Sequence, residues 1–175
     1  VAEALRRNRD LAGADLGGLD LSGIRLAGLN MAGADLRDAN LDGAVLAASN
    51  MAGVDLGGAR LNGARIAATN MADASLRGAQ LQAAKVSASN LAGVDLTGTD
   101  LSESSWFNVN VYGADFADAR TTGARARGVN WSDAKAPPAE IPEPIPSPPW
   151  LPALLAGIGI LLVVVIILAN KRKRA

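Results

Sequence analysis

A hydrophobic residue recurs at every fifth position over more than two thirds of the chain. From Leu11 to Trp131 there are 25 such positions without a shift in register, and only Thr121 among them is polar. We call these positions the centres of the repeats. The residue two places before each centre is small or aliphatic except at Arg9, and the residue two places after it is most often Gly. Internal periodicity of this length decides the architecture before any secondary-structure propensity is considered.

A period of five matches neither the 3.6 residues of a helical turn nor the two-residue alternation of a strand. The repeated residues can all face one core only if the chain turns a corner once in each repeat. One large and one small apolar residue then point inward. Polar residues and Gly lie outside or at the corner, where Gly most easily adopts unusual backbone dihedrals.

A second period, of twenty residues, is superimposed on the first. It concerns the residue directly before each centre, which falls into columns of like type. The columns are Asn at 30, 50, 70, 90, 110 and 130; Asp at 15, 35, 55, 95 and 115, with Ser75 in the remaining place; and Arg25, Arg65, Lys85 and Arg125, interrupted by Val45 and Ser105. Stacking of like residues predicts four repeats per coil, a little over six coils, and a body about 30 Å long at ~4.8 Å per coil.

The repeat resembles the pentapeptide-repeat family, whose pattern A(D/N)LxG stands here as Ala34-Asp35-Leu36 and Ala39-Asn40-Leu41. The resemblance covers roughly residues 9–133. It implies an all-β fold, a right-handed quadrilateral β-helix with four pentapeptides per coil.

The ends of the body depart from the repeat and are expected to close the core, because terminal units of a solenoid need caps. Residues 1–8 predict a short helix over the first coil, and residues 9–134 the β-helix. Trp106, Phe116 and Trp131 replace leucines near its end, which predicts an irregular last coil or two closed by aromatic side chains. All eight prolines follow, between Pro137 and Pro152, so residues 135–150 predict an extended, semi-rigid linker that is neither helix nor sheet.

Composition excludes several kinds of catalytic site. The chain has no Cys and no His, so it cannot form a disulfide, a Cys or His metal site, or a catalytic set that needs either residue. A leucine-filled coil also offers no obvious cleft for convergent catalytic groups. We expect no catalytic residue, cofactor, bound metal or small-molecule substrate. The enzymatic alternative needs a pocket of convergent polar groups at the aromatic end, near Trp106, Phe107, Tyr112 and Trp131.

Two neighbouring faces of the predicted body are built from small, uncharged residues after the centres. A smooth apolar strip on a protein surface is typical of a contact site. Phe107 and Tyr112 occupy the same kind of position and are expected to point outward as anchors for a partner. The predicted interaction surface comprises Ala27, Ala32, Ala47, Ala52, Ala67, Ala72, Ala92, Phe107 and Tyr112. The alternative is that Ala is only a small filler at these positions.

The Asp column is expected to be a solvated face whose charge repulsion is relieved by Arg37, Arg60 and Arg77, and cation binding is the less favoured interpretation. The Asn column is expected to link coils through hydrogen bonds between its side-chain amides.

The C-terminal segment predicts one transmembrane α-helix at residues 151–170, followed by a basic tail at 171–175. Residues 151–169 are uncharged and span about 28 Å as a helix, close to the ~30 Å hydrocarbon core of a bilayer. Trp150 precedes the segment, and Lys171, Arg172, Lys173 and Arg174 follow it, as is typical of residues at membrane interfaces.

The basic tail also predicts the orientation of a single-pass membrane protein. Four cations after the helix against Lys135 before it place the C-terminus in the cytoplasm and the repeat domain outside it, in the periplasm or an equivalent space. The alternative is a tail-anchored protein with a cytoplasmic repeat domain.

The favoured function is that of a non-catalytic, membrane-anchored structural subunit. Its rigid β-helix would dock on subunits of a larger membrane protein complex, of respiratory or photosynthetic type. The alternative implied by the family resemblance is a DNA mimic that binds gyrase or another topoisomerase. Residues 1–134 carry 12 basic and 15 acidic side chains, a net charge of −3, whereas 30 Å of duplex DNA carries about 18 charges. The charge therefore favours the docking function, and we expect no nucleic-acid partner.

Overall fold

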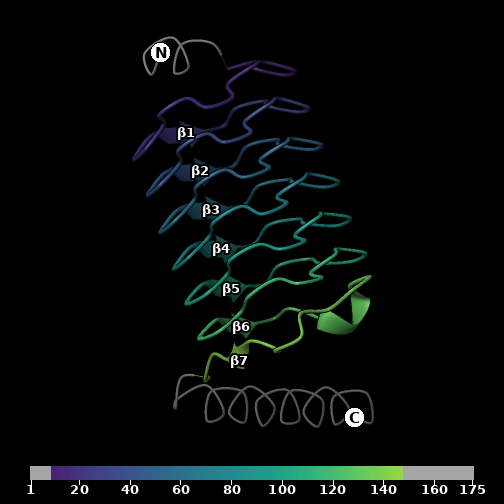
Figure 1. Cartoon of the computed structure of the whole chain (residues 1–175). Helices are drawn as coiled ribbons and strands as arrows, with labels where there is room; N and C mark the ends of the chain where they lie inside the picture. Colours follow the sequence, from purple (N-terminus) through teal and green to yellow (C-terminus); the bar gives the residue numbers. More distant parts are fainter. Residues whose placement is uncertain (1–8, 148–175) are drawn as a thin grey trace, which may run out of the picture. The chain divides into compact units, whose positions relative to one another are not determined.

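Every twenty residues of the repeat body complete one coil of a right-handed β-solenoid of about six coils (Figure 1). The structure is a computed structural model that describes residues 9–147. The chain divides into two compact units, Val1–Pro144 and Ile145–Ala175, and the solenoid lies in the first. The predicted β-helix and its four repeats per coil are confirmed. The expected N-terminal helix, transmembrane helix and basic tail lie outside the described residues.

One side of each coil is a short β-strand, and these strands form a single parallel sheet in chain order. Paired residues are twenty apart from strand to strand through β6, so Leu26 lies beside Leu46 and Leu46 beside Ile66. Isolated parallel bridges join the other three sides at the same interval. The strands are β1 (Arg25–Ala27), β2 (Val45–Ala47), β3 (Arg65–Ala67), β4 (Lys85–Ser87), β5 (Ser105–Phe107), β6 (Arg125–Arg127) and β7 (Glu143–Pro144).

The centres of the repeats and the small residues before them fill the interior. Leu36, Leu56 and Leu96 are at most 1% exposed, and the alanines two places before such centres, such as Ala34 and Ala59, are fully buried. A side chain larger than Ala at the second position would compete with the centres for the same space, since protein interiors are close-packed. The small residue of each repeat is therefore a packing requirement of the coil.

The corners of the coil are of two kinds. After three sides, a backbone turn closes the corner: Val54 N–H donates to Met51 C=O across Gly53, whose φ is +63°. At two of the corners after the β-strand side, a buried hydroxyl of the next coil accepts the amide instead. Leu29 N–H donates to Ser49 Oγ, and Thr69 N–H to Ser89 Oγ, both at 3.2 Å. Side-chain hydroxyls thus satisfy buried amides at this corner.

Three aromatic residues pack together at the C-terminal end of the solenoid, as the sequence predicts. Phe116 and Trp131 have ring centroids 5.4 Å apart, and each lies 6.0 Å from Trp106, all in edge-to-face geometry. Trp106 Nε1 donates to Ser104 Oγ at 2.9 Å, so its buried N–H has a partner. The repeat itself stays regular through β6. The irregularity begins only with the 3₁₀ turn η1 (Trp131–Asp133), later than predicted.

The Pro-rich segment differs from the predicted linker over its first ten residues. Ala136 forms a bridge with Asp115, and β7 pairs with β6 through Arg125 and Glu143. The number of residues between paired positions lengthens to 21 for Asp115 and Ala136 and then shortens to 18 for Arg125 and Glu143. The period of twenty therefore no longer predicts which residues pair. Proline is compatible with a terminal strand because its missing N–H leaves only an outer position without a donor. Residues 136–144 therefore close the last coil, and the solenoid ends at Pro144.

Candidate interaction surfaces

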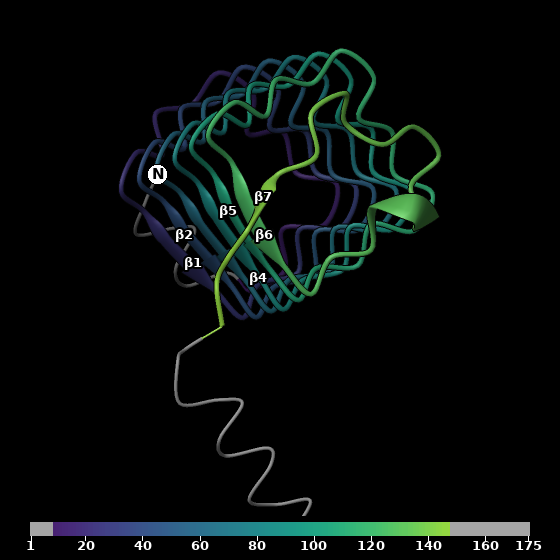
Figure 2. The same cartoon turned by 90° about the horizontal axis from the view of Figure 1, so that it is seen from below.

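The solenoid has four sides (Figure 2), and each carries a different pair of outward columns of side chains. In every repeat the residues directly before and after the buried centre lie outside, as in the exposed–buried–exposed pattern of β1. We name three sides by these columns and call the remaining one, which carries Asn40, Arg60, Gln80, Asp42, Asn62 and Gln82, the third side. The Asn/Ala face carries Asn30, Asn50, Asn70, Asn90, Asn110, Ala32, Ala52, Ala72 and Ala92; the Asp face carries Asp15, Asp35, Asp55, Ser75, Asp95 and Asp115; the basic sheet face is the outer side of β1–β6.

The asparagines of the Asn/Ala face form a continuous ladder along the solenoid. Each Nδ2 donates to the Oδ1 one coil earlier, from Asn110 to Asn90 at 2.8 Å and from Asn70 to Asn50 at 3.3 Å. Each Oδ1 also accepts the N–H two residues on, as Asn110 Oδ1 does from Tyr112 at 3.1 Å. The predicted amide ladder is confirmed, and these amides both link the coils and close the turns.

The alanines after these centres form a stacked column beside the ladder. Gly53 N–H donates to Ala72 C=O, and Asp73 N–H to Ala92 C=O, which holds the column in register. Four of the predicted contact residues, Ala32, Ala52, Ala72 and Ala92, are therefore together and half-buried. Tyr112 ends the column and is 68% exposed. The result is a narrow surface of amides and methyl groups four coils long with an aromatic residue at its C-terminal end, and Asp73 is the one charged residue in the corner row beside it.

The Asp face uses the same turn chemistry with charged side chains. Asp35 Oδ1 accepts the N–H of Arg37 at 3.0 Å, and Asp55 Oδ1 that of Gly57 at 2.9 Å. A carboxylate cannot donate a hydrogen bond to the next carboxylate. Among residues 9–147 no group of three or more acidic side chains is placed to hold a metal ion. The Asp column therefore caps turns, in the way that short polar residues commonly do.

Cations offset the repulsion within this column. Arg37 pairs with Asp35 and lies 3.8 Å from Asp55, and Lys135 Nζ lies 2.9 Å from Asp115. The hydrogen bond from Arg37 lowers the pKa of Asp35 to about 2, and the hydrogen bond from Lys135 lowers the pKa of Asp115. Arg77 pairs with Asp95 at 2.7 Å. With these cations and with Ser75 in the column, the Asp face does not reproduce a continuous line of phosphates.

One predicted partner of the Asp column lies elsewhere. Arg60 belongs to the third side and pairs with Asp42 at 2.5 Å, away from the Asp column. Its position in the repeat places it one side further along the coil than Arg37 and Arg77. The prediction used closeness in sequence, whereas contact across coils depends on the interval of about twenty.

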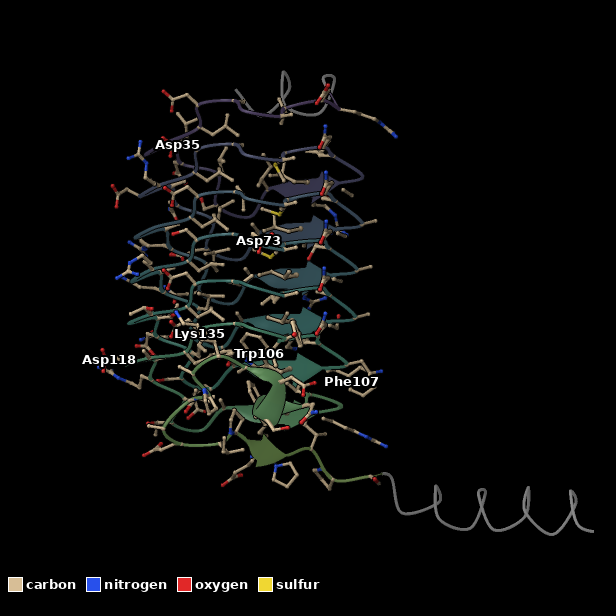
Figure 3. The ribbon with its side chains drawn as sticks, turned by 90° about the vertical axis from the view of Figure 1, so that its right-hand side faces the viewer. Asp35, Asp73, Trp106, Phe107, Asp118 and Lys135 are labelled. Atoms are coloured by element: carbon tan, nitrogen blue, oxygen red, sulfur yellow. The ribbon has the colours of Figure 1, made fainter. Side chains whose placement is uncertain are left out.

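The other predicted contact residues lie on the basic sheet face. Ala27, Ala47 and Ala67 stack in the outward column of β1–β3, and Phe107 continues that column in β5 with 44% of its surface exposed. Figure 3 shows Phe107 pointing away from the coil stack on the side opposite Asp35 and Asp118. The nine predicted contact residues therefore divide between two adjoining sides.

The prediction that both of these sides are nearly uncharged is wrong for the second one. The residue before each centre also points outward from a strand, and on this side it is Arg25, Arg65, Lys85 or Arg125. The period of twenty in the sequence already contains this basic column. The residues after the centres do not contain it, so a prediction from those residues alone leaves it out.

A shallow hollow lies beside the aromatic end, where the enzymatic alternative requires a pocket. It has a volume of about 330 Å³ and is lined by residues that include Asn108, Asn110, Asn130 and Asp133. Asp133 is its one titratable lining residue and is exposed. Amides with a single exposed carboxylate can hydrogen-bond a polar group, but they do not supply the paired acid and base that general acid–base catalysis uses.

Among the described residues, no helix has the length and apolar character needed to cross a bilayer. The predicted interface residues Trp150, Lys171, Arg172, Lys173 and Arg174 lie outside the described part of the chain.

A family model described as "Pentapeptide repeats" matches the sequence in eight copies, over residues 10–43, 39–78, 49–87 and 74–110. No curated protein sequence matches the chain.

Solved structures of similar fold include QnrB1, a plasmid-mediated fluoroquinolone resistance protein, in a trypsin-treated form. It is 18% identical, with 74% of each chain covered and a TM-score of 0.57. A pentapeptide repeat protein from the thylakoid lumen of Arabidopsis thaliana is 28% identical, covering 55% of this chain and 70% of that one, with a TM-score of 0.47. Rfr23 from the cyanobacterium Cyanothece 51142 is 23% identical, covering 74% and 95%, with a TM-score of 0.47.

Proposed function

Because the chain belongs to the pentapeptide-repeat family, whose members are generally non-catalytic, we propose that it is a membrane-anchored interaction subunit. Its Asn/Ala face docks on the extramembrane part of a larger membrane protein complex, of respiratory or photosynthetic type. Residues 151–169 anchor it in the bilayer, with Trp150 and the cations at 171–174 at the two interfaces.

The observation that carries this proposal is the pair of uncharged columns, Asn and Ala, that runs along four coils on one side of a charged solenoid. The position after the centre holds Ala four times in succession on the Asn/Ala face, from Ala32 to Ala92. On the third side the same turn position holds Asp42, Asn62 and Gln82 in three successive coils. The turn thus accepts charged and large polar side chains, so the fold does not require Ala there. The uniform Ala column supports selection for a smooth contact surface.

The partner surface follows from the chemistry of this face. Its amides are already hydrogen-bonded to one another, so a partner gains little by offering donors or acceptors along the ladder. The Ala methyl groups favour a flat apolar surface that can approach closely. Tyr112, with 68% of its surface exposed, supplies an aromatic anchor at the C-terminal end of this surface.

The orientation of the anchored protein remains the one that the basic residues favour. Four cations follow the apolar segment, which places the C-terminus in the cytoplasm and the solenoid on the opposite side of the membrane. A tail-anchored arrangement would instead place the solenoid in the cytoplasm. Protease accessibility in sealed, right-side-out vesicles distinguishes the two arrangements. Added protease reaches the solenoid in the first arrangement and not in the tail-anchored one.

Co-purification from gently solubilised membranes tests the docking face. Replacing Ala52 and Ala72 with Arg adds two charges to the Asn/Ala face, and we expect the yield of co-purified complex to fall at least tenfold. Asn62→Arg with Gln82→Arg is the matched control, since it adds the same charge at the same turn position in the same coils on the third side. Undiminished recovery with Ala52→Arg and Ala72→Arg would contradict the proposal.

A further inference from the structure

The basic sheet face concentrates positive charge without an internal partner. The outward positions of β1–β6 hold five cations and no carboxylate: Arg25, Arg65, Lys85, Arg125 and Arg127. The one acid in the sheet is Glu143 of β7, at its C-terminal edge. The positive charge therefore runs along most of the length of the solenoid on this side.

Cations on the other sides are used differently. Arg37, Arg77 and Lys135 on the Asp face and Arg60 and Arg120 on the third side each lie within 4.0 Å of a carboxylate. Within the described residues, no ion pair of this kind involves the five cations of the basic sheet face. Internal ion pairing accounts for the first group and leaves the second group available to an external anion.

The basic sheet face is also flat. On the first four strands the second outward residue is small, Ala27, Ala47, Ala67 or Ser87, and the first is a cation on every strand but β2, where it is Val45. Six stacked strands at ~4.8 Å extend over about 24 Å. A flat surface with cations on four of its six strands matches an array of anions arranged in a plane.

The short connection between β7 and the apolar segment indicates which planar array of anions lies close to the basic sheet face. β7 continues this sheet and ends at Pro144, and the apolar segment begins at Leu151. The seven peptide steps between them reach at most about 25 Å even when fully extended. If residues 151–169 span a bilayer, the C-terminal edge of the basic sheet face cannot lie farther than that from the start of the spanning segment.

We propose that the basic sheet face lies on an anionic bilayer surface, with its five cations against the phosphate-bearing lipid headgroups. The inference rests on the proposed membrane anchor. Each Lys or Arg near an anionic membrane surface strengthens association about fivefold, and high salt removes the effect. Phe107, 44% exposed in the same sheet, is placed to enter the interface, where aromatic side chains are favoured.

This placement also leaves the proposed docking face free. The Asn/Ala face adjoins the basic sheet face at one corner of the quadrilateral coil (Figure 2). A solenoid that rests on its basic sheet face turns its Asn/Ala face sideways, so that this face stands at an angle to the membrane surface and looks along it. A neighbouring membrane protein could then meet the docking face without displacing the lipid contact.

Site-specific fluorescence quenching tests the inference on the full-length protein. The chain has no Cys, so Val45→Cys and Ser75→Cys each give a single labelling site, at the same position in the repeat on opposite sides. The labelled proteins are reconstituted into vesicles of phosphatidylcholine with 30% phosphatidylglycerol and a nitroxide-headgroup lipid. We expect quenching at position 45 to exceed that at position 75 at least threefold, and to fall in pure phosphatidylcholine or in 0.5 M NaCl. Equal quenching at both sites would overturn the inference.

Charge variants separate the lipid contact from the anchor. Arg65→Gln with Lys85→Gln should reduce quenching at position 45 to the level at position 75, whereas Arg37→Gln with Arg77→Gln, an equal change in charge, should leave it unchanged. Retention of the protein after alkaline extraction with equal quenching at both sites contradicts the lipid contact alone. Loss on extraction, with flotation on anionic vesicles that depends on Arg65 and Lys85, contradicts the anchor alone. No association in either assay contradicts both.

A duplex competitor tests the other polyanion. At equal phosphate concentration, a 30-base-pair DNA duplex should not reduce the quenching of the label at position 45 on anionic vesicles. Loss of this quenching, with tighter binding to the duplex than to the vesicles, would assign the basic sheet face to nucleic acid and overturn the lipid contact.

Discussion

The Asn/Ala face and the Asp face perform the same structural task with different electrostatic results. On both, the residue before the centre accepts the N–H two residues on, as Asn70 does from Ala72 and Asp55 does from Gly57. The Asn amides also link coil to coil, whereas the carboxylates recruit Arg37, Arg77 and Lys135. Since either residue closes the turn, the solenoid tolerates charge on any side. The lack of charge along the Ala column therefore favours function over folding as its cause.

The two faces also begin at different corners, which gives the largest expected effect. The corner before the Asn/Ala face relies on buried hydroxyls: Ser89 Oγ accepts Thr69 N–H at 3.2 Å and donates to Ser87 C=O at 2.8 Å. The corner before the Asp face is closed by the backbone, as Val94 N–H donates to Leu91 C=O. Ser89→Ala should therefore lower the free energy of unfolding by about 1–3 kcal/mol, because it leaves a buried N–H without an acceptor.

Chemical denaturation measures this difference, with Ser75→Ala on the Asp face as the control. That serine is a half-buried surface residue, and its replacement should change stability by less than about 0.5 kcal/mol. Equal effects of the two substitutions would mean that the hydroxyl corner is not distinct.

Exchanging the side chains of the two columns gives the next largest effect. Asn70→Asp keeps the acceptor for Ala72 N–H but removes the amide donated to Asn50 Oδ1, so we expect a loss of about 1 kcal/mol. The reverse exchange, Asp55→Asn, removes one member of a like-charged column and should change stability by less than about 0.5 kcal/mol. Thermal and denaturant unfolding of both variants would show whether the asymmetry holds.

The corner row between the Asn/Ala face and the basic sheet face contains strained alanines. Ala48, Ala68 and Ala88 have φ of +50°, +53° and +48°, in the left-handed region that favours Gly. Ala68→Gly relieves the strain at some cost in chain entropy, and we expect a gain of about 0.5 kcal/mol. If the same variant recovers less of the partner complex, the methyl group of Ala68 contributes to the docking surface. Lower stability would show that the corner is not strained.

The smallest effect is a pH dependence that the Asp face should show and the Asn/Ala face should not. The hydrogen bond from Arg37 lowers the pKa of Asp35 to about 2 from its ordinary 3.8. A lowered pKa in the folded state contributes stability above pH 4 that is lost as the pH falls from 4 to 2. Because the pair is exposed, the contribution is small. Asp35→Asn should flatten the dependence of the urea midpoint between pH 4 and 2. An unchanged slope would contradict the assigned pair.

The sequence predicted the coil because its two periods depend on residue type alone. Leucine centres, the Asn ladder and the aromatic end all followed from counting. The periods could not distinguish the two kinds of corner, since Ser49 and Ala34 are both small enough for the interior and only the backbone geometry shows which amide needs a hydroxyl. They also could not predict β7, where the interval changes to 18.

The candidate surfaces were predicted in part for a related reason. The Ala column and the exposure of Tyr112 follow from the positions after the centres. The charge beside Ala27, Ala47 and Ala67 requires knowing that both neighbours of a buried strand residue point outward.

Photo-crosslinking in native membranes tests the docking claim most directly. A photo-reactive phenylalanine analogue in place of Ala72 on the Asn/Ala face is compared with the same analogue in place of Gln82, on the third side of the same coil. We predict a discrete crosslink to a membrane protein subunit from position 72 and none to that subunit from position 82. Crosslinks of equal yield from both positions, or from position 82 alone, would contradict the assignment of the Asn/Ala face as the docking surface.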